Sequence, residues 1–217
     1  MSEPAYLTRT RSGYDAIAEE CADLFLSELR RSPLDRALLG AFAEIVGAEF
    51  PDGRTVEVGS GPGAITDLLA GRGLDVTGIE LSPAMVAQAR RTYPDRAYEV
   101  GDMRALAATD LAGLVAWYSL IHIAPEERAA VVAGFARALR PGGYLLLGFQ
   151  VGTEVHHVAE VFGKEVGLDF HRMDPDDVTA LLEAAGFALV SRTVRAPEPG
   201  SRAAAVPQAC LIARRHG

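Results

Sequence analysis

Beyond Phe50, short apolar segments alternate with stretches long enough to form helices. The expected strands span residues 55–58, 74–79, 97–100, 114–118 and 144–148, and the expected helices span residues 65–70, 83–92 and 125–139. This alternation favours a parallel sheet whose strands are joined by right-handed crossovers. The middle of the chain is therefore predicted to be a doubly wound α/β domain.

Both ends of the chain add further elements to this domain. Apolar residues at helical spacing predict helices over residues 14–29 and 34–47, so two helices are expected before the first strand. After the fifth strand, a predicted helix over residues 175–185 precedes strands over residues 187–194 and 209–213. A Pro- and Gly-rich stretch joins those two strands and is expected to be a surface loop or hairpin.

The charge of the chain limits the substrates that it suits. The formal net charge is −8, and the 21 Lys and Arg residues include one lysine, Lys164. The basic residues are scattered, so they form no stripe that could neutralise a phosphate backbone. This argues against nucleic acid as the main substrate and favours small molecules.

The cysteines and the hydropathy pattern point to the cytoplasm. Cys21 and Cys210 are isolated and have neither metal-type nor CxxC spacing, which fits a reducing compartment. Residues 1–14 lack the continuous apolar run of a signal peptide, and no later run is long enough to span a membrane. We therefore expect a cytoplasmic protein with no membrane partner.

The strongest chemical signal is a glycine-rich turn that follows the first predicted strand. Residues 55–63 read Thr-Val-Glu-Val-Gly-Ser-Gly-Pro-Gly, and a predicted helix follows. Glycines let the backbone approach a ligand closely, and the helix presents free N–H groups. Gly59, Gly61 and Ala64 also satisfy the dinucleotide fingerprint, with Glu80 about twenty residues later. At this point both a nicotinamide dinucleotide and another adenosine-containing cofactor remain open.

The glycine-rich turn is the first of five ordered segments, which are Glu57–Gly63, Gly78–Ser82, Gly101–Arg104, Tyr118–His122 and Leu139–Leu145. Each segment alone is a weak signal, but the five in this order are specific. The set resembles the class I S-adenosylmethionine-dependent methyltransferases, of the kind known as methyltransferase type 11 or domain 25. One departure is Ser60, where the family often has cysteine.

The resemblance implies both the fold and the cofactor. It implies a Rossmann-like sheet of seven mostly parallel strands in the order 3-2-1-4-5-7-6, with the last strand antiparallel. Residues 1–50 would form N-terminal helices that cover the cofactor as a lid within the same domain, and residues 51–217 would form the methyltransferase domain. The cofactor would be S-adenosyl-L-methionine, and its product S-adenosyl-L-homocysteine.

The resemblance also implies a set of cofactor-binding residues. Glu80 would accept both ribose hydroxyls, and Asp102 would accept the adenine amino group. Leu81 and Met103 would sandwich the adenine ring. The full expected set is Glu57, Gly59, Ser60, Gly61, Gly63, Glu80, Leu81, Met85, Asp102, Met103 and Tyr118.

His122 is the candidate catalytic residue, as a base or as a group that orients the substrate. Ligands of such sheets bind at the carboxyl ends of the strands, where this residue should lie. The alternative is that His122 caps or packs against the helix that begins near Pro125. The expected substrate-binding residues are Tyr14, Ser119, His122 and His156. His156, His157 and His171 have no diagnostic ligand spacing, so no metal is expected.

The resulting prediction is a methyltransferase that acts on the oxygen or nitrogen of a small molecule, as a monomer or homodimer. An NAD(P)-dependent oxidoreductase is the first alternative, but a Tyr-x-x-x-Lys constellation is absent because Glu160 stands four residues before Lys164. A protein that binds S-adenosylmethionine without catalysis is the second. The acceptor itself stays open, because the lid and residues 150–171 would build its pocket.

Overall fold

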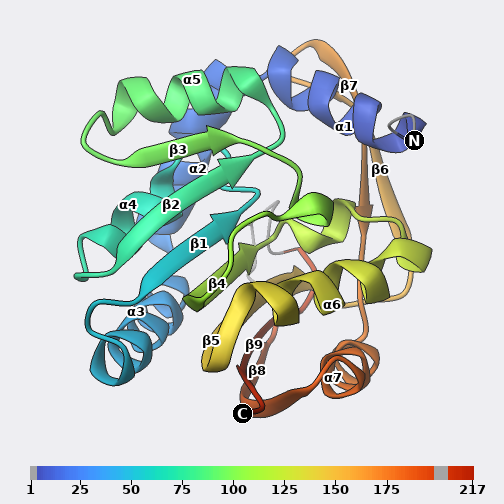
Figure 1. The fold of residues 1–217 in the computed structure, drawn as a ribbon. Coiled ribbons are helices and arrows are strands. Elements are labelled where there is room, and N and C mark those ends of the chain that lie inside the picture. The colour runs from blue at the N-terminus through green and yellow to red at the C-terminus, as the bar shows by residue number, and fades with distance from the viewer. Residues whose placement is uncertain (1–3, 198–204) are drawn as a thin grey trace.

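A seven-stranded sheet forms the centre of the molecule (Figure 1). The computed structural model describes residues 4–197 and 205–217. The strands of this sheet are β1 (Arg54–Val58), β2 (Asp75–Glu80), β3 (Ala97–Val100), β4 (Leu111–Trp117), β5 (Leu139–Gln150), β8 (Phe187–Arg195) and β9 (Gln208–Arg215). Their spatial order is β3-β2-β1-β4-β5-β9-β8.

The strand directions confirm the predicted topology. β1 pairs in parallel with β2 and β4, and β3 and β5 extend the parallel region on either side. β9 pairs antiparallel with both β5 and β8. Counted within this sheet alone, the order is 3-2-1-4-5-7-6 with a reversed last strand.

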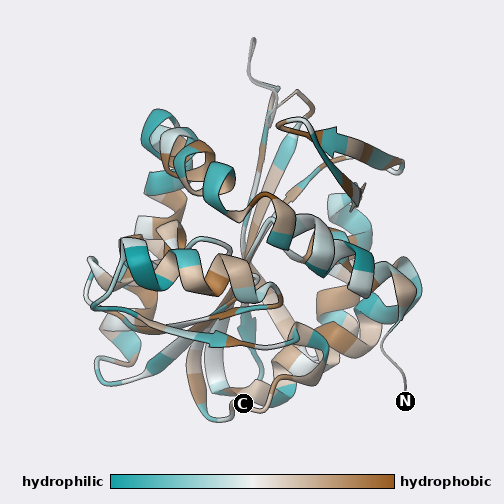
Figure 2. Cartoon of the chain, turned by 90° about the horizontal axis from the view of Figure 1, so that it is seen from above, coloured by the Kyte–Doolittle hydropathy of each residue, from teal (hydrophilic) through white to brown (hydrophobic). Residues whose placement is uncertain are grey.

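Helices cover both faces of the sheet. On one face lie α3 (Pro33–Glu49), α4 (Ala64–Ala70) and α5 (Pro83–Thr92), and on the other lie α6 (Arg128–Ala138) and α7 (Pro175–Ala184). Each face buries its own cluster of apolar side chains. Figure 2 shows hydrophobic stretches on the central strands and hydrophilic stretches on the outer turns of the surrounding helices. Within residues 4–197 and 205–217, no helix combines the length and apolar character needed to cross a bilayer.

The N-terminal region differs from the prediction, because three helices rather than two precede β1. They are α1 (Ala5–Ala16), α2 (Ala18–Arg31) and α3. The helical conformation is interrupted at Ile17, where φ is −118°. The predicted start of the first helix at Tyr14 is therefore wrong, because α1 begins at Ala5. The pattern hides α1 because its buried residues are Leu7, Thr10 and Gly13, only one of which is a large apolar residue.

A two-stranded hairpin covers the carboxyl edge of the sheet together with α1. It consists of β6 (Val155–Val161) and β7 (Lys164–His171), within the segment where the sequence indicated no regular element. α1 packs directly on β7, because a Cβ atom at Gly13 would lie 2.4 Å from the carbonyl oxygen of Val166. A side chain at Gly13 would therefore force the two elements apart.

We expect Gly13→Ala to destabilise the protein by about 1–2 kcal/mol, because the cost of the backbone clash exceeds the gain in helix propensity. Gly47→Ala in α3 is the matched control. A Cβ there would lie 3.8 Å from Leu74, an ordinary contact, so this change should stabilise by up to about 1 kcal/mol. Chemical denaturation measures both effects. Equal gains in the two variants would contradict the close α1–β7 contact.

Candidate active site at the carboxyl edge of the sheet

The glycine-rich turn between β1 and α4 stands at the carboxyl edge. Gly59 has φ +68°, and a Cβ atom there would lie 2.3 Å from Cβ of Ser119. Gly63 caps α4 with φ +91°, and a Cβ there would lie 2.4 Å from the hydroxyl of Tyr98. The amide of Gly59 donates to the carbonyl of Ile79 over 2.7 Å, which fixes the turn against the end of β2. Only glycine fits this path of the backbone.

Two predicted cofactor residues near this turn face the interior instead. Glu57 is 1% exposed and accepts a hydrogen bond from the hydroxyl of Thr66, and burial raises its pKa to about 8. Ser60 is also buried, and its hydroxyl packs close to the backbone of Gly78. Both side chains therefore pack in the interior next to the turn.

Glu80 ends β2 beside the turn. One carboxylate oxygen accepts the amide of Gly61 over 2.9 Å, and the other accepts the amide of Ser82 over 2.8 Å. Burial raises the pKa of Glu80, and these backbone hydrogen bonds oppose that shift. Each carboxylate oxygen offers about two acceptor positions, so both retain capacity for a hydroxyl donor. This arrangement fits the two adjacent hydroxyls of a ribose.

Asp15 joins α1 to the same corner of the site, a contact that the sequence did not indicate. Its carboxylate accepts the hydroxyl of Ser82 over 2.5 Å and the amide of Ala84 over 3.1 Å. Ser82 in turn caps α5 by accepting the amide of Met85. α1 is thereby attached to the first turn of α5, next to Glu80.

The other predicted cofactor-binding residues lie in two different environments. Leu81 and Met103 are partly exposed near the ends of β2 and β3. Asp102 follows β3, and both of its carboxylate oxygens accept hydrogen bonds from Arg104. Met85 is 1% exposed and packs in a cluster that includes Ile17. Met85 therefore forms part of the packing beneath α1 and α2.

His122 and Tyr14 meet from distant parts of the chain. His122 lies in the short 3₁₀ helix η2 (Leu120–His122), and its Nε2 is 2.8 Å from the hydroxyl of Tyr14 in α1. Its Nδ1 is 2.9 Å from the carbonyl oxygen of Asp169 in β7. Phe170 packs edge-on against the imidazole with ring centroids 4.8 Å apart. Contacts from α1 and β7 thus hold this ring in place.

The hydrogen bonds of His122 define its tautomer. A carbonyl oxygen only accepts, so Nδ1 carries the proton that is donated to Asp169. Burial lowers the pKa of His122 to about 4, so the ring is neutral at pH 7 and Nε2 holds a lone pair. The hydroxyl of Tyr14 therefore donates to Nε2. Burial also raises the pKa of Tyr14, which keeps the phenol protonated.

The depressed pKa of His122 predicts a loss of stability at acid pH. The unfolded chain takes up this proton near pH 6.5, whereas the folded protein resists it until about pH 4. Between these values each unit of falling pH should cost up to about 1.4 kcal/mol. His122→Gln lacks the titration. Its stability relative to the wild type should therefore rise as the pH falls from 6.5 to 4 in urea unfolding experiments, and a constant difference would contradict the buried neutral ring.

The remaining predicted cofactor and substrate residues are not all directed toward this pair. Ser119 is buried and donates its hydroxyl to the carbonyl of Val58 over 2.7 Å. Tyr118 has φ +53°, rare for a residue other than glycine, and its hydroxyl is 3.4 Å from Nη2 of Arg195. His156 is exposed on β6, with its ring centroid 6.3 Å from that of Phe170. Among the described residues, no three His, Cys, Asp or Glu side chains are placed to hold a metal ion.

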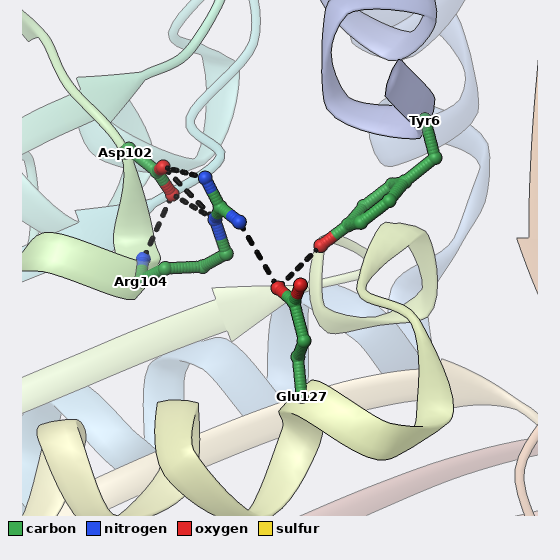
Figure 3. Close-up of polar contacts among 4 residues, drawn as sticks. All are labelled: Tyr6, Asp102, Arg104 and Glu127. Atoms are coloured by element: carbon green, nitrogen blue, oxygen red, sulfur yellow. Dashed lines mark hydrogen bonds and ion pairs between the residues drawn. The ribbon is translucent and has the colours of Figure 1, made fainter. Parts of the chain in front are cut away.

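Sequence reasoning also missed a polar network that links this edge to α1. Arg104 binds Asp102 on one side and Glu127 on the other, and Glu127 accepts the hydroxyl of Tyr6 (Figure 3). Arg104 belongs to the motif after β3, but its partner Glu127 could not be predicted from the local pattern. Tyr6 and Glu127 are 121 positions apart, so no local pattern reveals their contact.

Comparisons with known proteins show a likeness to methyltransferases in the middle of the chain. Residues 56–143 match a family model described as a methyltransferase domain. A carboxy-S-adenosyl-L-methionine synthase of Chromohalobacter salexigens is 32% identical over 153 residues, which cover 54% of this chain and 57% of the relative. A trans-aconitate 2-methyltransferase of Methylobacterium nodulans is 35% identical over 94 residues, which cover 42% and 36%. The matches thus span about half, or less, of these curated relatives.

A solved structure extends the likeness to the whole chain. The 1,6-didemethyltoxoflavin-N1-methyltransferase of Burkholderia thailandensis matches with a TM-score of 0.72 at 19% identity, covering 100% of this chain and 92% of that one. Residues 56–143 thus resemble a methyltransferase domain, and the whole chain has the fold of a class I S-adenosylmethionine-dependent methyltransferase.

Proposed function

We propose that this chain binds S-adenosylmethionine at the carboxyl edge of its sheet and transfers the methyl group to an oxygen or nitrogen of a small molecule. The observation that carries the proposal is Glu80, a buried carboxylate held by the amides of Gly61 and Ser82 beside the glycine-rich turn. The match of residues 56–143 to a methyltransferase domain supports the same cofactor.

In this proposal the residues around the turn bind and orient the cofactor. Glu80 accepts the ribose hydroxyls, and the backbone of Gly59 and Gly61 approaches the amino-acid end. Asp102 accepts a hydrogen bond from the adenine amino group, and the adenine ring lies between Leu81 and Met103. When bound, S-adenosylmethionine supplies an electrophilic methyl group on a cationic sulfur. The task left to the protein is to align the nucleophile and to remove its proton where necessary.

Tyr14 and His122 are the groups suited to that second task. A hydroxyl or amine of the acceptor that reaches Tyr14 can pass its proton to the phenol oxygen, while the phenol proton moves to Nε2 of His122. The Asp169 carbonyl orients the imidazole for this transfer by accepting from Nδ1. Neighbouring Phe170 adds an apolar wall. This pairing favours an uncharged acceptor that is at least partly apolar.

We further propose that residues 1–50 include the cover of the site. Asp15 fastens α1 to the start of α5. Gly61 faces Phe25 of α2, which lies 3.7 Å from the position that a Cβ would take. Helices α1 and α2 therefore lie over the turn and exclude water from it. Their displacement would open a path to Glu80.

A thermal-shift comparison tests the cofactor. Ligands that bind only the folded state raise the melting temperature by mass action. A ligand concentration of one hundred times the dissociation constant adds about 2.7 kcal/mol to the free energy of unfolding. We expect S-adenosylmethionine and S-adenosylhomocysteine to stabilise the protein, and NAD⁺ and NADP⁺ to have no effect. Stabilisation by the dinucleotides alone would favour an oxidoreductase and overturn the proposal.

Methyl transfer needs a second measurement, because binding does not demonstrate turnover. Incubation with donor and a panel of small hydroxyl and amine acceptors should release S-adenosylhomocysteine together with a methylated product. A carboxylated cofactor would instead indicate the chemistry in the name of the Chromohalobacter relative. Cofactor binding with no product from any acceptor would favour a binding protein without catalysis.

A further inference from the structure

The polar network of Tyr6, Glu127, Arg104 and Asp102 connects three elements at the adenine end of the proposed site (Figure 3). Tyr6 belongs to α1, Glu127 to the 3₁₀ turn η3 (Pro125–Glu127), and Arg104 to the 3₁₀ turn η1 (Met103–Ala105). The hydroxyl of Tyr6 donates to Glu127 over 2.7 Å, and Nη1 of Arg104 donates to the same carboxylate oxygen over 3.0 Å. Arg104 is therefore the centre of the network.

The contact between Arg104 and Asp102 orients that carboxylate. Oδ2 accepts Nε over 3.0 Å and Nη2 over 2.8 Å, while Oδ1 accepts the backbone amide of Arg104 over 2.9 Å. The remaining contact, from Nε to Oδ1, is the longest at 3.3 Å. A carboxylate oxygen offers about two acceptor positions, so Oδ1 is the oxygen best able to accept a further donor.

The charge states of the network favour this arrangement. The guanidinium lies between two carboxylates, and its hydrogen bond to Asp102 is the main cause of its raised pKa. The hydrogen bond from Tyr6 and then that from Arg104 lower the pKa of Glu127. Burial raises the pKa of Tyr6 to about 12, so the phenol keeps its proton and donates. The phenol is therefore neutral at pH 7 beside the charged Arg104 and Glu127.

Partial exposure makes this network more important for position than for stability. The side chains of Arg104, Asp102 and Glu127 are 21%, 26% and 32% exposed. Ion pairs at such sites contribute little to the free energy of unfolding, because water and salt screen them. Loss of one contact should therefore leave the fold intact and change where Asp102 and α1 lie.

We propose that Arg104 is a positioning residue that directs Asp102 toward the cofactor adenine and, through Glu127 and Tyr6, couples cofactor binding to the docking of α1. This inference rests on the proposed function. Because coupling is reciprocal, a bound adenine should hold α1 more firmly, and a loosened α1 should weaken adenine binding by the same factor. Oδ1 of Asp102 would accept a hydrogen bond from the adenine amino group.

The test uses Tyr6→Phe, Arg104→Met and the double variant in the full chain. Isothermal titration gives the affinities for S-adenosylhomocysteine and for S-inosylhomocysteine, in which an oxygen replaces the adenine amino group. Amide hydrogen exchange over residues 5–16 reports the docking of α1 with and without S-adenosylhomocysteine. Tyr144→Phe is the matched control, because Tyr144 of β5 donates to Glu49 and Glu49 binds Arg214 in a similar network.

We expect the wild type to prefer S-adenosylhomocysteine over the inosine analogue by about tenfold, the effect of one hydrogen bond to a charged group. Arg104→Met should lower that preference at least about threefold and weaken the binding of S-adenosylhomocysteine, since Asp102 loses its orientation. Tyr6→Phe should weaken the binding of S-adenosylhomocysteine by about threefold. It should also speed amide hydrogen exchange in α1 when this ligand is bound. The double variant should have the affinities of Arg104→Met, and Tyr144→Phe should have those of the wild type.

Several results would overturn the inference. An unchanged preference in Arg104→Met would show that Arg104 does not position Asp102, and tighter binding would show that the guanidinium competes with adenine. Wild-type affinity and exchange in Tyr6→Phe would remove the coupling to α1. If the wild type itself fails to bind S-adenosylhomocysteine, the proposed function fails as well, so the two failures are distinguishable.

Discussion

Replacing Glu80 with alanine is expected to weaken the binding of S-adenosylmethionine by about 10- to 100-fold, the effect of losing hydrogen bonds to a buried carboxylate. The reason lies in the two contacts that hold this side chain. The amides of Gly61 and Ser82 aim the carboxylate from opposite sides, so its position needs no reorganisation when a ribose arrives. Loss of the side chain also leaves the amide of Gly61 unpaired and frees the turn to move.

Isothermal titration with S-adenosylhomocysteine measures this effect, and Glu99→Ala provides the control. Glu99 lies opposite Ile79 on the neighbouring strand and is exposed, so its removal changes the net charge equally without touching the turn. Glu80→Gln separates charge from shape, because its amide oxygen still accepts one backbone hydrogen bond. An affinity in Glu80→Ala equal to that of Glu99→Ala would show that the ribose does not bind at Glu80.

The sequence predicts the parallel part of the fold well because local patterns determine it. The helix over residues 83–92 and the strand over residues 97–100 have the predicted bounds, since polar or breaking residues flank each apolar run. β5 extends beyond its predicted range of 144–148 and begins at Leu139, directly after α6. There the pairing with β4 extends the strand beyond what propensity alone indicates.

The cover of the site could not be predicted in the same way. α1 is held by Gly13 against β7 and by polar contacts of Asp15, so it has no apolar stripe to reveal it. β6 is mostly exposed and lacks a buried alternate face, and β7 buries only Val166 and Leu168. Such elements are specified by contacts between distant segments, which appear only after the chain has folded.

The site illustrates the same division between local and distant signals. Glu80 lies at the end of a strand that its own segment predicts, and its role can be inferred from spacing to the glycine turn. Tyr14 and His122 are 108 residues apart, and nothing in the sequence indicates that their side chains meet. Their hydrogen bond changes the hypothesis about His122, because the lone pair of its Nε2 faces a phenol rather than an open pocket.

His122→Ala should lower kcat by about 100- to 10,000-fold on an acceptor that must lose a proton, the usual contribution of a general base. Cofactor affinity should change little, because no hydrogen bond joins His122 to Glu80 or to the glycine turn in the described structure. Tyr14→Phe should cause a comparable loss, since the phenol stands between the acceptor and the imidazole. Because burial lowers the pKa of His122 to about 4, kcat should stay level from about pH 8 to pH 5 with respect to this group.

His157→Ala is the matched control for this prediction, because both histidines contact Asp169. His157 binds the Asp169 carboxylate over 2.7 Å at an exposed position, whereas His122 binds the Asp169 carbonyl beneath α1. Removing His157 should therefore leave kcat unchanged while altering the same hairpin. A full rate in His122→Ala, or equal losses in the two variants, would mean that the imidazole only supports the packing of Tyr14 and Phe170. The protein would then catalyse methyl transfer by alignment alone, on an acceptor that is already a nucleophile.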